Sequence, residues 1–116
     1  MKMDRHHTIF TARTWSVYRE GEALRESPSL IATMPVDLHR ELHRNCPPVP
    51  VPSHHALQFI ISRFEPVRGD VLASMDNLML TIEESTKRPR MHHIERALAE
   101  LTIWGLEAQK PYLEQI

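Results

Sequence analysis

The chain has 116 residues, a formal net charge of −1 with its histidines neutral, and 41% hydrophobic residues. This composition excludes a disordered chain and predicts a single domain, residues 1–116, with a modest apolar core. Proteins that hold nucleic acid through the phosphate backbone are usually basic, so any DNA contact must be local, weak, aided by a metal or made by an oligomer.

Cysteine content and hydropathy limit the other classes of protein. Cys46 is the single cysteine, which excludes an internal disulfide and a cysteine-type zinc site and favours a reducing compartment. Residues 1–7 are mostly polar and lack the apolar run of a signal peptide, and no apolar stretch approaches the ~20 residues of a membrane span. We therefore expect a cytoplasmic protein without a membrane partner.

The N-terminal part of the chain predicts two short strands and a short helix. Residues 8–18 mix β-branched and aromatic side chains, which favours an extended segment, and the polar residues 19–29 predict a loop. The apolar run 30–34 predicts the second strand. A helix that ends at Asn45 is expected next, with Thr33 as its N-cap and a proline in its first turn.

The remaining residues predict a stiff connector followed by three helices. Residues 46–52 carry four prolines, and proline fixes φ and lacks a backbone donor, so this segment is expected to be extended. Apolar periodicity then predicts one helix between Ser53 and Pro66 and two more over about 68–85 and 91–110. The proline at the end of the last helix is expected to bend or end it.

The apolar faces of these helices are the expected core. Trp15 and Trp104 are expected to anchor it because their rings dominate small cores, and the methionines are expected to fill gaps or interfaces. The combined faces exceed what the N-terminal part can cover, so the helices are expected to pack as a three-helix unit or to form a homodimer surface. On the last helix the expected apolar face comprises Ile94, Ala97, Leu98, Leu101, Trp104, Leu106 and Ala108.

The eight histidines come in four groups, and two of the groups have the layout of a metal site. His6-His7 lie near the predicted strands, and His39 and His43 are four residues apart on the predicted helix, so the side chains of the second group share one face. A third imidazole from a strand completes a three-nitrogen site with an open position, as catalytic metal sites require. A neighbouring histidine can then act as general base on water.

The other two groups, His54-His55 and His92-His93, open predicted helices. His92-His93 adjoin the basic turn 87–90, which is either a phosphate contact or a solvated turn, and the solvated turn is the commoner arrangement.

The first two groups resemble the site of the HNH (ββα-metal) nucleases, most closely of the colicin-type DNase branch. In that family a His-His pair ends the first strand, an Asn-containing loop leads to the second strand, and a helix carries the ligand histidines. Here His6-His7 correspond to the pair, and TMPVDLHRELHR, residues 33–44, resembles the second strand, the proline-led helix start and the H-x-x-x-H motif. The resemblance covers residues 5–45, and the chain as a whole also resembles small phage proteins.

The resemblance implies a role for each histidine of these two groups. His6, His39 and His43 would ligate a divalent metal ion, namely zinc, nickel or magnesium. His7 would be the general base, which activates a water molecule that attacks the scissile phosphate.

The groups around this site depart from the family pattern. Segment 26–30 lacks the family's Asn, so Ser29 or Ser27 would orient the base with a shorter reach. The loop between the two histidine groups is longer than in the colicin type. Arg5 or Arg44 would contact the phosphate, since arginine suits oxyanions.

The sequence therefore predicts an α+β fold in which a small ββα-metal element (1–45) and the proline-rich connector (46–52) precede a three-helix extension (53–116). The expected function is metal-dependent hydrolysis of DNA phosphodiester bonds, or a DNA-directed role derived from it. The alternative is a catalytically inactive HNH-like interaction protein, such as a phage protein that binds a host protein through its helical half. A third interpretation is a plain helical protein whose histidines share no site.

Overall fold

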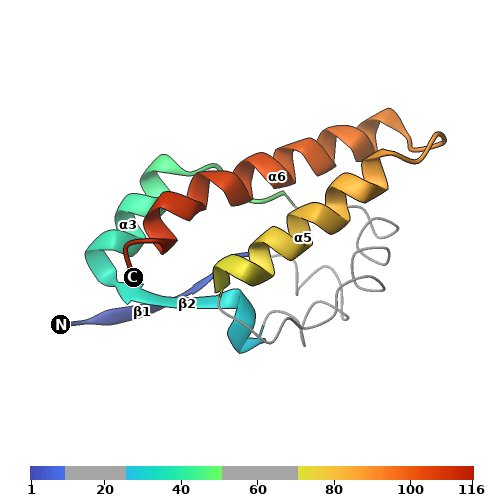
Figure 1. Cartoon of the computed structure of the whole chain (residues 1–116). Helices are drawn as coiled ribbons and strands as arrows, with labels where there is room; N and C mark the ends of the chain where they lie inside the picture. Colours follow the sequence, from blue (N-terminus) through green and yellow to red (C-terminus); the bar gives the residue numbers. More distant parts are fainter. Residues whose placement is uncertain (10–25, 51–70) are drawn as a thin grey trace.

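A computed structural model describes residues 1–9, 26–50 and 71–116. This part of the chain is an α+β structure with one two-stranded antiparallel sheet, three α-helices and a turn of 3-10 helix, η1 (Pro28–Leu30) (Figure 1). None of these helices combines the length and apolar character that crossing a bilayer requires. Outside the described residues lie most of the expected segment 8–18, residues 19–25 of the expected loop, the helix between Ser53 and Pro66, Trp15 and His54-His55.

The sheet consists of β1 (Met3–His7) and β2 (Ile31–Pro35). Successive side chains of a strand alternate between the two faces, so Asp4 and His6 share one face of β1. Their cross-strand partners on β2 are a buried methionine and a buried alanine. This face packs against the helix that follows β2, which directs Asp4 and His6 toward that helix.

The first strand lies earlier in the chain than composition predicted. Residues 8–18 were expected to be extended, whereas β1 ends at His7, which is where the HNH resemblance places the His-His pair. Charged residues make β1 a poor strand by propensity, but pairing with the apolar β2 fixes its extended backbone. The second strand is confirmed within one residue of its expected bounds.

The helix α3 (Val36–Asn45) confirms the expected end but not the expected N-cap. Thr33 is exposed in the middle of β2 and pairs with Arg5, which keeps its backbone extended. The N-cap position is therefore taken by Pro35, and no side chain caps the helix.

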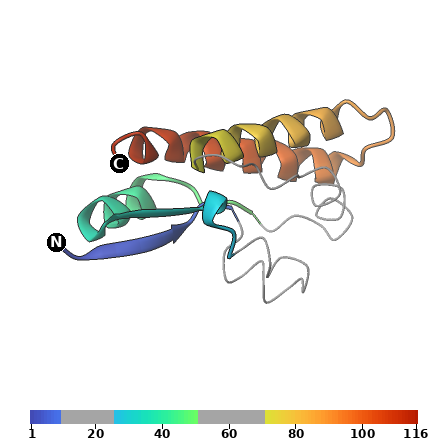
Figure 2. The same ribbon diagram turned by 60° about the horizontal axis from the view of Figure 1, so that its bottom comes forward.

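The C-terminal part is a helical hairpin of α5 (Val71–Thr86) and α6 (His93–Leu113), which run antiparallel and side by side (Figures 1 and 2). Pro111 was expected to bend or end the last helix. It does not end the helix, since α6 continues for two residues after it. A proline so close to the C-terminus removes one hydrogen bond only, and the Glu114 N–H still donates to the Lys110 carbonyl at 2.9 Å.

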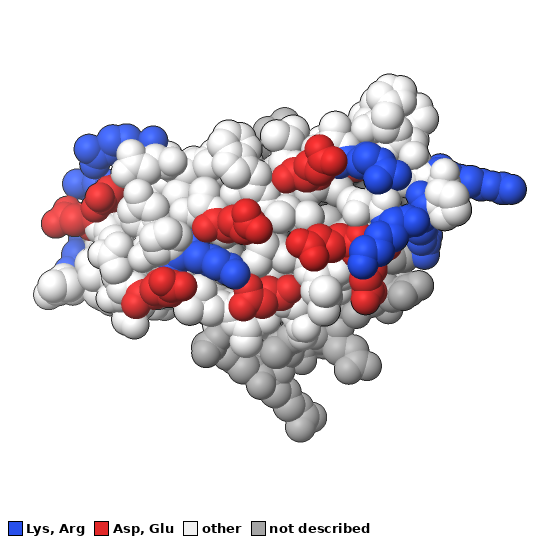
Figure 3. All heavy atoms as spheres, turned by 45° about the horizontal axis from the view of Figure 1, so that its top comes forward, with Lys and Arg blue, Asp and Glu red and all other residues white. Residues whose placement is uncertain are grey.

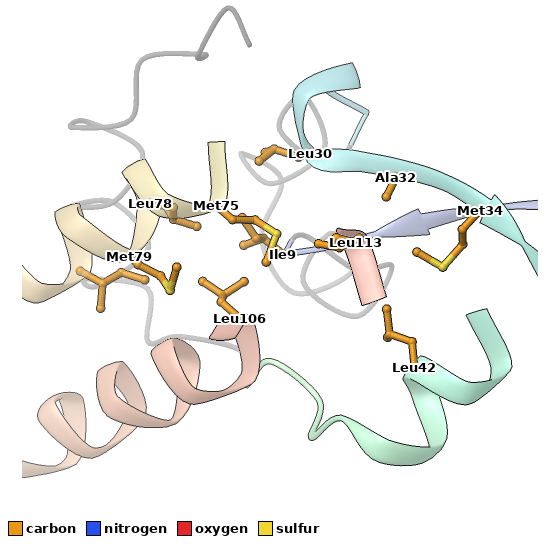
Figure 4. Packing of buried hydrophobic residues seen from close by; sticks show 11 residues of the cluster. Ile9, Leu30, Ala32, Met34, Leu42, Met75, Leu78, Met79, Leu106 and Leu113 are labelled. Carbon is orange, nitrogen blue, oxygen red and sulfur yellow. The ribbon is translucent and has the colours of Figure 1, made fainter. Parts of the chain in front are cut away.

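One apolar core lies between this hairpin and the ββα element formed by β1, β2 and α3 (Figure 4). The buried face of α5 confirms the apolar periodicity that predicted this helix, and its two methionines, Met75 and Met79, fill the core as expected. From the ββα element, Met34 and Leu42 are fully buried, and Leu106 and Leu113 of α6 close the contact. The buried residues of α5 are Met75, Leu78, Met79 and Ile82, together with Ser74 and Ser85.

The buried face of α6 differs from the predicted one. Trp104 is 57% exposed and is not a core anchor, and Leu101 is 46% exposed. The buried face instead includes Gly105 and Gln109. At Gly105 the connector comes so close that an added Cβ would lie 3.2 Å from Val49 Cγ2, so a residue without a side chain suits this position of the buried face.

Candidate metal centre

Three histidines converge where β1 meets α3. His6 Nδ1 lies 3.1 Å from His39 Nε2, and His43 Nε2 lies 2.8 Å from the same His39 nitrogen. One ligand nitrogen from each ring lies within 4.8 Å of the others. We refer to these three residues as the histidine triad. Among the described residues it is the only group of His, Cys, Asp or Glu side chains with such convergence.

Local structure explains why these three rings meet. His39 and His43 are one helical turn apart, so their side chains stack along one face of α3. Leu42 lies between them in sequence, is 2% exposed and fixes that side of the helix against the core. His6 points to the same side because it shares the helix-facing surface of β1 with Asp4.

A glutamine from the far end of the chain fixes the protonation of His6. Gln109 of α6 is 4% exposed, and its side-chain Nε2 donates to the backbone carbonyls of Thr8 at 3.1 Å and Gly105 at 3.3 Å. The amide oxygen must therefore face His6, whose Nε2 lies 2.7 Å away. Because an amide oxygen only accepts, His6 carries its proton on Nε2 and leaves Nδ1 as a lone pair.

A carboxylate fixes the protonation of His39 in the same way. His39 Nδ1 lies 3.0 Å from Asp4 Oδ2, and the carboxylate accepts a hydrogen bond from it. Nε2 of the neutral ring is then a lone pair that faces the other two histidines. A carboxylate behind a histidine is the arrangement that orients imidazole ligands in metal proteins and makes them more basic.

The two fixed rings leave lone pairs opposite each other. His6 Nδ1 and His39 Nε2 are both acceptors at 3.1 Å, so they repel unless a cation, either a proton or a metal ion, lies between them. Two nitrogens that bind one tetrahedral zinc ion at its usual bond length are about 3.3 Å apart. The 3.1 Å between His6 Nδ1 and His39 Nε2 is close to that value and the 2.8 Å between His39 and His43 is shorter, so the triad could hold a metal ion after a small adjustment of the rings.

Burial keeps two of these rings neutral at physiological pH. Removal from water lowers the pKa of His6 to about 4, an effect that the hydrogen bond to Gln109 opposes and the nearby histidines reinforce. Burial, and then His39, also lowers the pKa of His43. A histidine must be neutral to bind a metal, so these shifts leave the ligand nitrogens available.

His7, the predicted general base, ends β1 next to the triad. Strand alternation directs it away from His6, toward the segment before β2, where its Nε2 lies 3.9 Å from Glu26 Oε1. It lines a cavity together with His6 and His43. Glu26 is thus the carboxylate that faces the position of the predicted base, whereas Ser29 is half-buried in η1.

The two arginines predicted to contact phosphate flank the triad on different elements. Arg5 is exposed on β1 and forms an ion pair with Glu26 at 3.4 Å, while Arg44 is exposed in the last turn of α3. His92 and His93 are remote from the triad in sequence and form part of the exposed start of α6, where His92 accepts a hydrogen bond from the Ile94 N–H.

Sequence reasoning predicted the three histidines that converge but missed the residues that orient them. Asp4 lies two residues before His6, and this spacing on a strand places both on one face, so the signal was present. Gln109 carries no such signal, because it is separated from His6 by 103 residues.

Comparison with known proteins places the chain in no family. No family profile, curated protein or solved structure matches the chain.

Proposed function

We propose that this protein is a metal-dependent hydrolase that cleaves phosphodiester bonds of DNA through a metal ion held by the histidine triad. The observation that carries the proposal is the pair of lone pairs that Asp4 and Gln109 force to face each other at 3.1 Å. Converging histidines whose other ring nitrogens are held by a carboxylate and an amide are an arrangement typical of metal centres. The order of strand, loop, strand and histidine-bearing helix is also the order of the HNH resemblance.

The ligand set favours a transition metal over magnesium. Imidazole suits zinc and nickel, whereas magnesium prefers oxygen ligands and retains several waters. We therefore narrow the expected ions to zinc or nickel. Three protein ligands leave a tetrahedral ion one position for water or substrate, as in catalytic zinc sites.

The chemistry divides between the ion and the chain. When bound, the ion neutralises charge on the phosphate in the transition state. His7 accepts one proton from the water molecule whose oxygen attacks phosphorus. The bond from phosphorus to the departing sugar oxygen then breaks, and the sugar oxygen takes up a proton from solvent. Glu26 supports the charged form of His7 during the transfer. Arg44 follows His43 in sequence and is exposed, whereas Arg5 is paired with Glu26, so we assign the phosphate contact to Arg44.

Surface charge argues against DNA contact along the whole molecule. In Figure 3 acidic and basic side chains are interspersed on the face shown, and basic side chains lie at both ends of the molecule, at the α5–α6 turn and at the opposite end. With a net charge of −1, the chain lacks the excess of positive charge that general phosphate binding requires.

Zinc binding is the first test of the proposal. We expect zinc at one thousand times its Kd to raise the free energy of unfolding by about 4 kcal/mol, measured by urea denaturation with and without a chelator. His39→Ala should abolish this gain, whereas His93→Ala, an exposed histidine on α6, should keep it. An equal gain in both variants would contradict the assignment of the site.

Cleavage of a plasmid is the second test. We expect the zinc or nickel form to nick DNA, and His7→Ala to lower the rate at least a hundredfold, within the range typical of a lost general base, while zinc affinity is kept. If the protein binds zinc tightly but never nicks plasmid or single-stranded DNA, the nuclease proposal is wrong.

A second candidate function follows from an exposed apolar face. Ile94, Leu101 and Trp104 lie at helical spacing on α6 and are 57%, 46% and 57% exposed. An exposed stripe of large apolar residues is typical of protein interfaces. This favours a protein-binding role, which would stand if zinc binds without cleavage and Trp104→Ala abolishes co-purification of a specific partner.

A further inference from the structure

A cavity of about 180 Å³ lies directly beside the histidine triad. Two metal-ligand candidates, His6 and His43, form part of its wall, and the buried polar side chains of Thr8 and Gln109 contribute to it. The remaining wall is largely apolar and comes from the end of α3 and the connector. Those residues are Leu42, Cys46, Pro47, Pro48 and Val49, with His7 completing the lining.

The connector wall of this cavity is fastened to α6. Asn45 Nδ2 donates to Tyr112 Oη at 2.9 Å, and the Cys46 thiol donates to the Ala108 carbonyl at 3.1 Å. Further along, Val49 packs against the bare backbone of Gly105. The prolines between these contacts restrict the backbone, so the cavity is preformed rather than a gap beside a loose segment.

Size and position together define what the cavity can hold. An apolar cavity of about 150 Å³ is large enough for benzene, so this one accommodates one five- or six-membered ring. Because two triad histidines form its wall, a ring inside it belongs to the part of the substrate next to the group at the metal. On a phosphodiester that ring is the pentose, since the base is one ring further away.

We propose that this cavity is the binding subsite for the sugar ring attached to the scissile phosphate. The inference rests on the proposed function and adds the part of the substrate that the chain recognises. The apolar wall packs against the C–H face of the pentose, and the metal ion with Arg44 receives the phosphate. The subsite therefore distinguishes a nucleotide from free phosphate.

Cys46 provides a direct test because it is the single cysteine of the chain and lines the cavity. We measure its alkylation rate by iodoacetamide in the zinc-loaded protein, with thymidine 5′-monophosphate or inorganic phosphate as the added probe. At ten times its Kd the nucleotide should slow alkylation about tenfold. Zinc alone and zinc with inorganic phosphate should leave the rate unchanged.

A covalent filling of the cavity gives an independent readout. Alkylation of Cys46 by N-ethylmaleimide places a ring in the cavity, and we expect the treated protein to keep its zinc affinity but lose at least tenfold in affinity for thymidine 5′-monophosphate. Cys46→Ser is the matched control, since the same treatment should leave its nucleotide affinity as it was before treatment.

The outcomes separate this inference from the proposed function. Equal protection by inorganic phosphate, or nucleotide binding by calorimetry without protection of Cys46, would overturn the sugar subsite while the metal centre stands. Absence of zinc binding by calorimetry would overturn the proposed function, and the subsite would fall with it. Protection by the nucleotide alone supports both.

Discussion

The ββα element brings together three imidazoles and a carboxylate where β1 meets α3, whereas the buried face of α5 in the α5–α6 hairpin consists mainly of leucine, isoleucine and methionine side chains. Both meet in one core, but they contribute differently to it. Apolar burial stabilises the hairpin whatever the solvent contains. The histidine triad brings lone pairs together, and we expect a cation that joins them to stabilise it.

This difference is expected to separate stability from function within the chain. The hairpin is expected to set the folding stability of the metal-free protein, and the ββα element to set its response to metal and acid. Gln109 is the exception, because it belongs to the hairpin and completes the metal centre. Three predictions test how far the separation holds.

The largest expected loss of stability comes from removing a buried apolar side chain of the hairpin. Leu106→Ala removes a fully buried side chain of α6 and should lower the free energy of unfolding by about 3–4 kcal/mol. Leu101→Ala on the exposed side of the same helix should change it by less than about 0.5 kcal/mol. Both variants should bind zinc with unchanged affinity in calorimetry. A large loss of zinc affinity in Leu106→Ala would mean that the two regions are not separable.

Lowering the pH should destabilise the metal-free protein through His6 of the ββα element. The pKa of His6 is about 4 in the folded protein and 6.5 in the unfolded chain, so the unfolded chain binds more protons between these values. Unfolding free energy of the metal-free protein should therefore be constant above pH 7 and fall by about 3 kcal/mol as the pH decreases from 6.5 to 4. Urea denaturation at a series of pH values measures this loss.

The control for this prediction is His6→Gln, which keeps a donor near Gln109 but does not titrate. Its unfolding free energy should lack the additional loss between pH 6.5 and 4, while His93→Gln should behave as the natural chain does. Parallel curves for the natural chain and His6→Gln would show that burial of His6 has no such effect.

The smallest of the three effects tests the link between the regions. Gln109→Met keeps the volume but removes the acceptor for His6 Nε2, so zinc affinity should fall tenfold to a hundredfold, or about 1.4–2.7 kcal/mol. Nitrogen NMR shifts of His6 should show the proton moving from Nε2 to a mixture of both nitrogens. Gln109→Glu restores an acceptor and should recover the tautomer.

A matched control for that variant lies nearby on the chain. Gln115→Met alters an exposed glutamine after the end of α6 and should change neither zinc affinity nor the nitrogen shifts. If Gln109→Met weakens zinc binding while the His6 tautomer stays unchanged, Gln109 acts on packing alone and its positioning role is wrong.

Local patterns in the sequence determined the elements that depend on near neighbours. The spacing of His39 and His43 placed both rings on one face of α3, and the apolar run before Pro35 gave β2 within one residue. The stripe on α5 was likewise confirmed as core. Each depends on the fixed periodicity of a helix or strand, which acts over a few residues.

Tertiary contacts decided the rest. Strand pairing kept Thr33 extended and removed it from the helix cap, and α6 packs its Gly105 face against the connector while Trp104 is exposed. The same packing brought Gln109 to His6 across 103 residues of sequence. No periodicity specifies a contact between such distant residues, so only the folded chain determines which nitrogen of His6 is available to a metal ion.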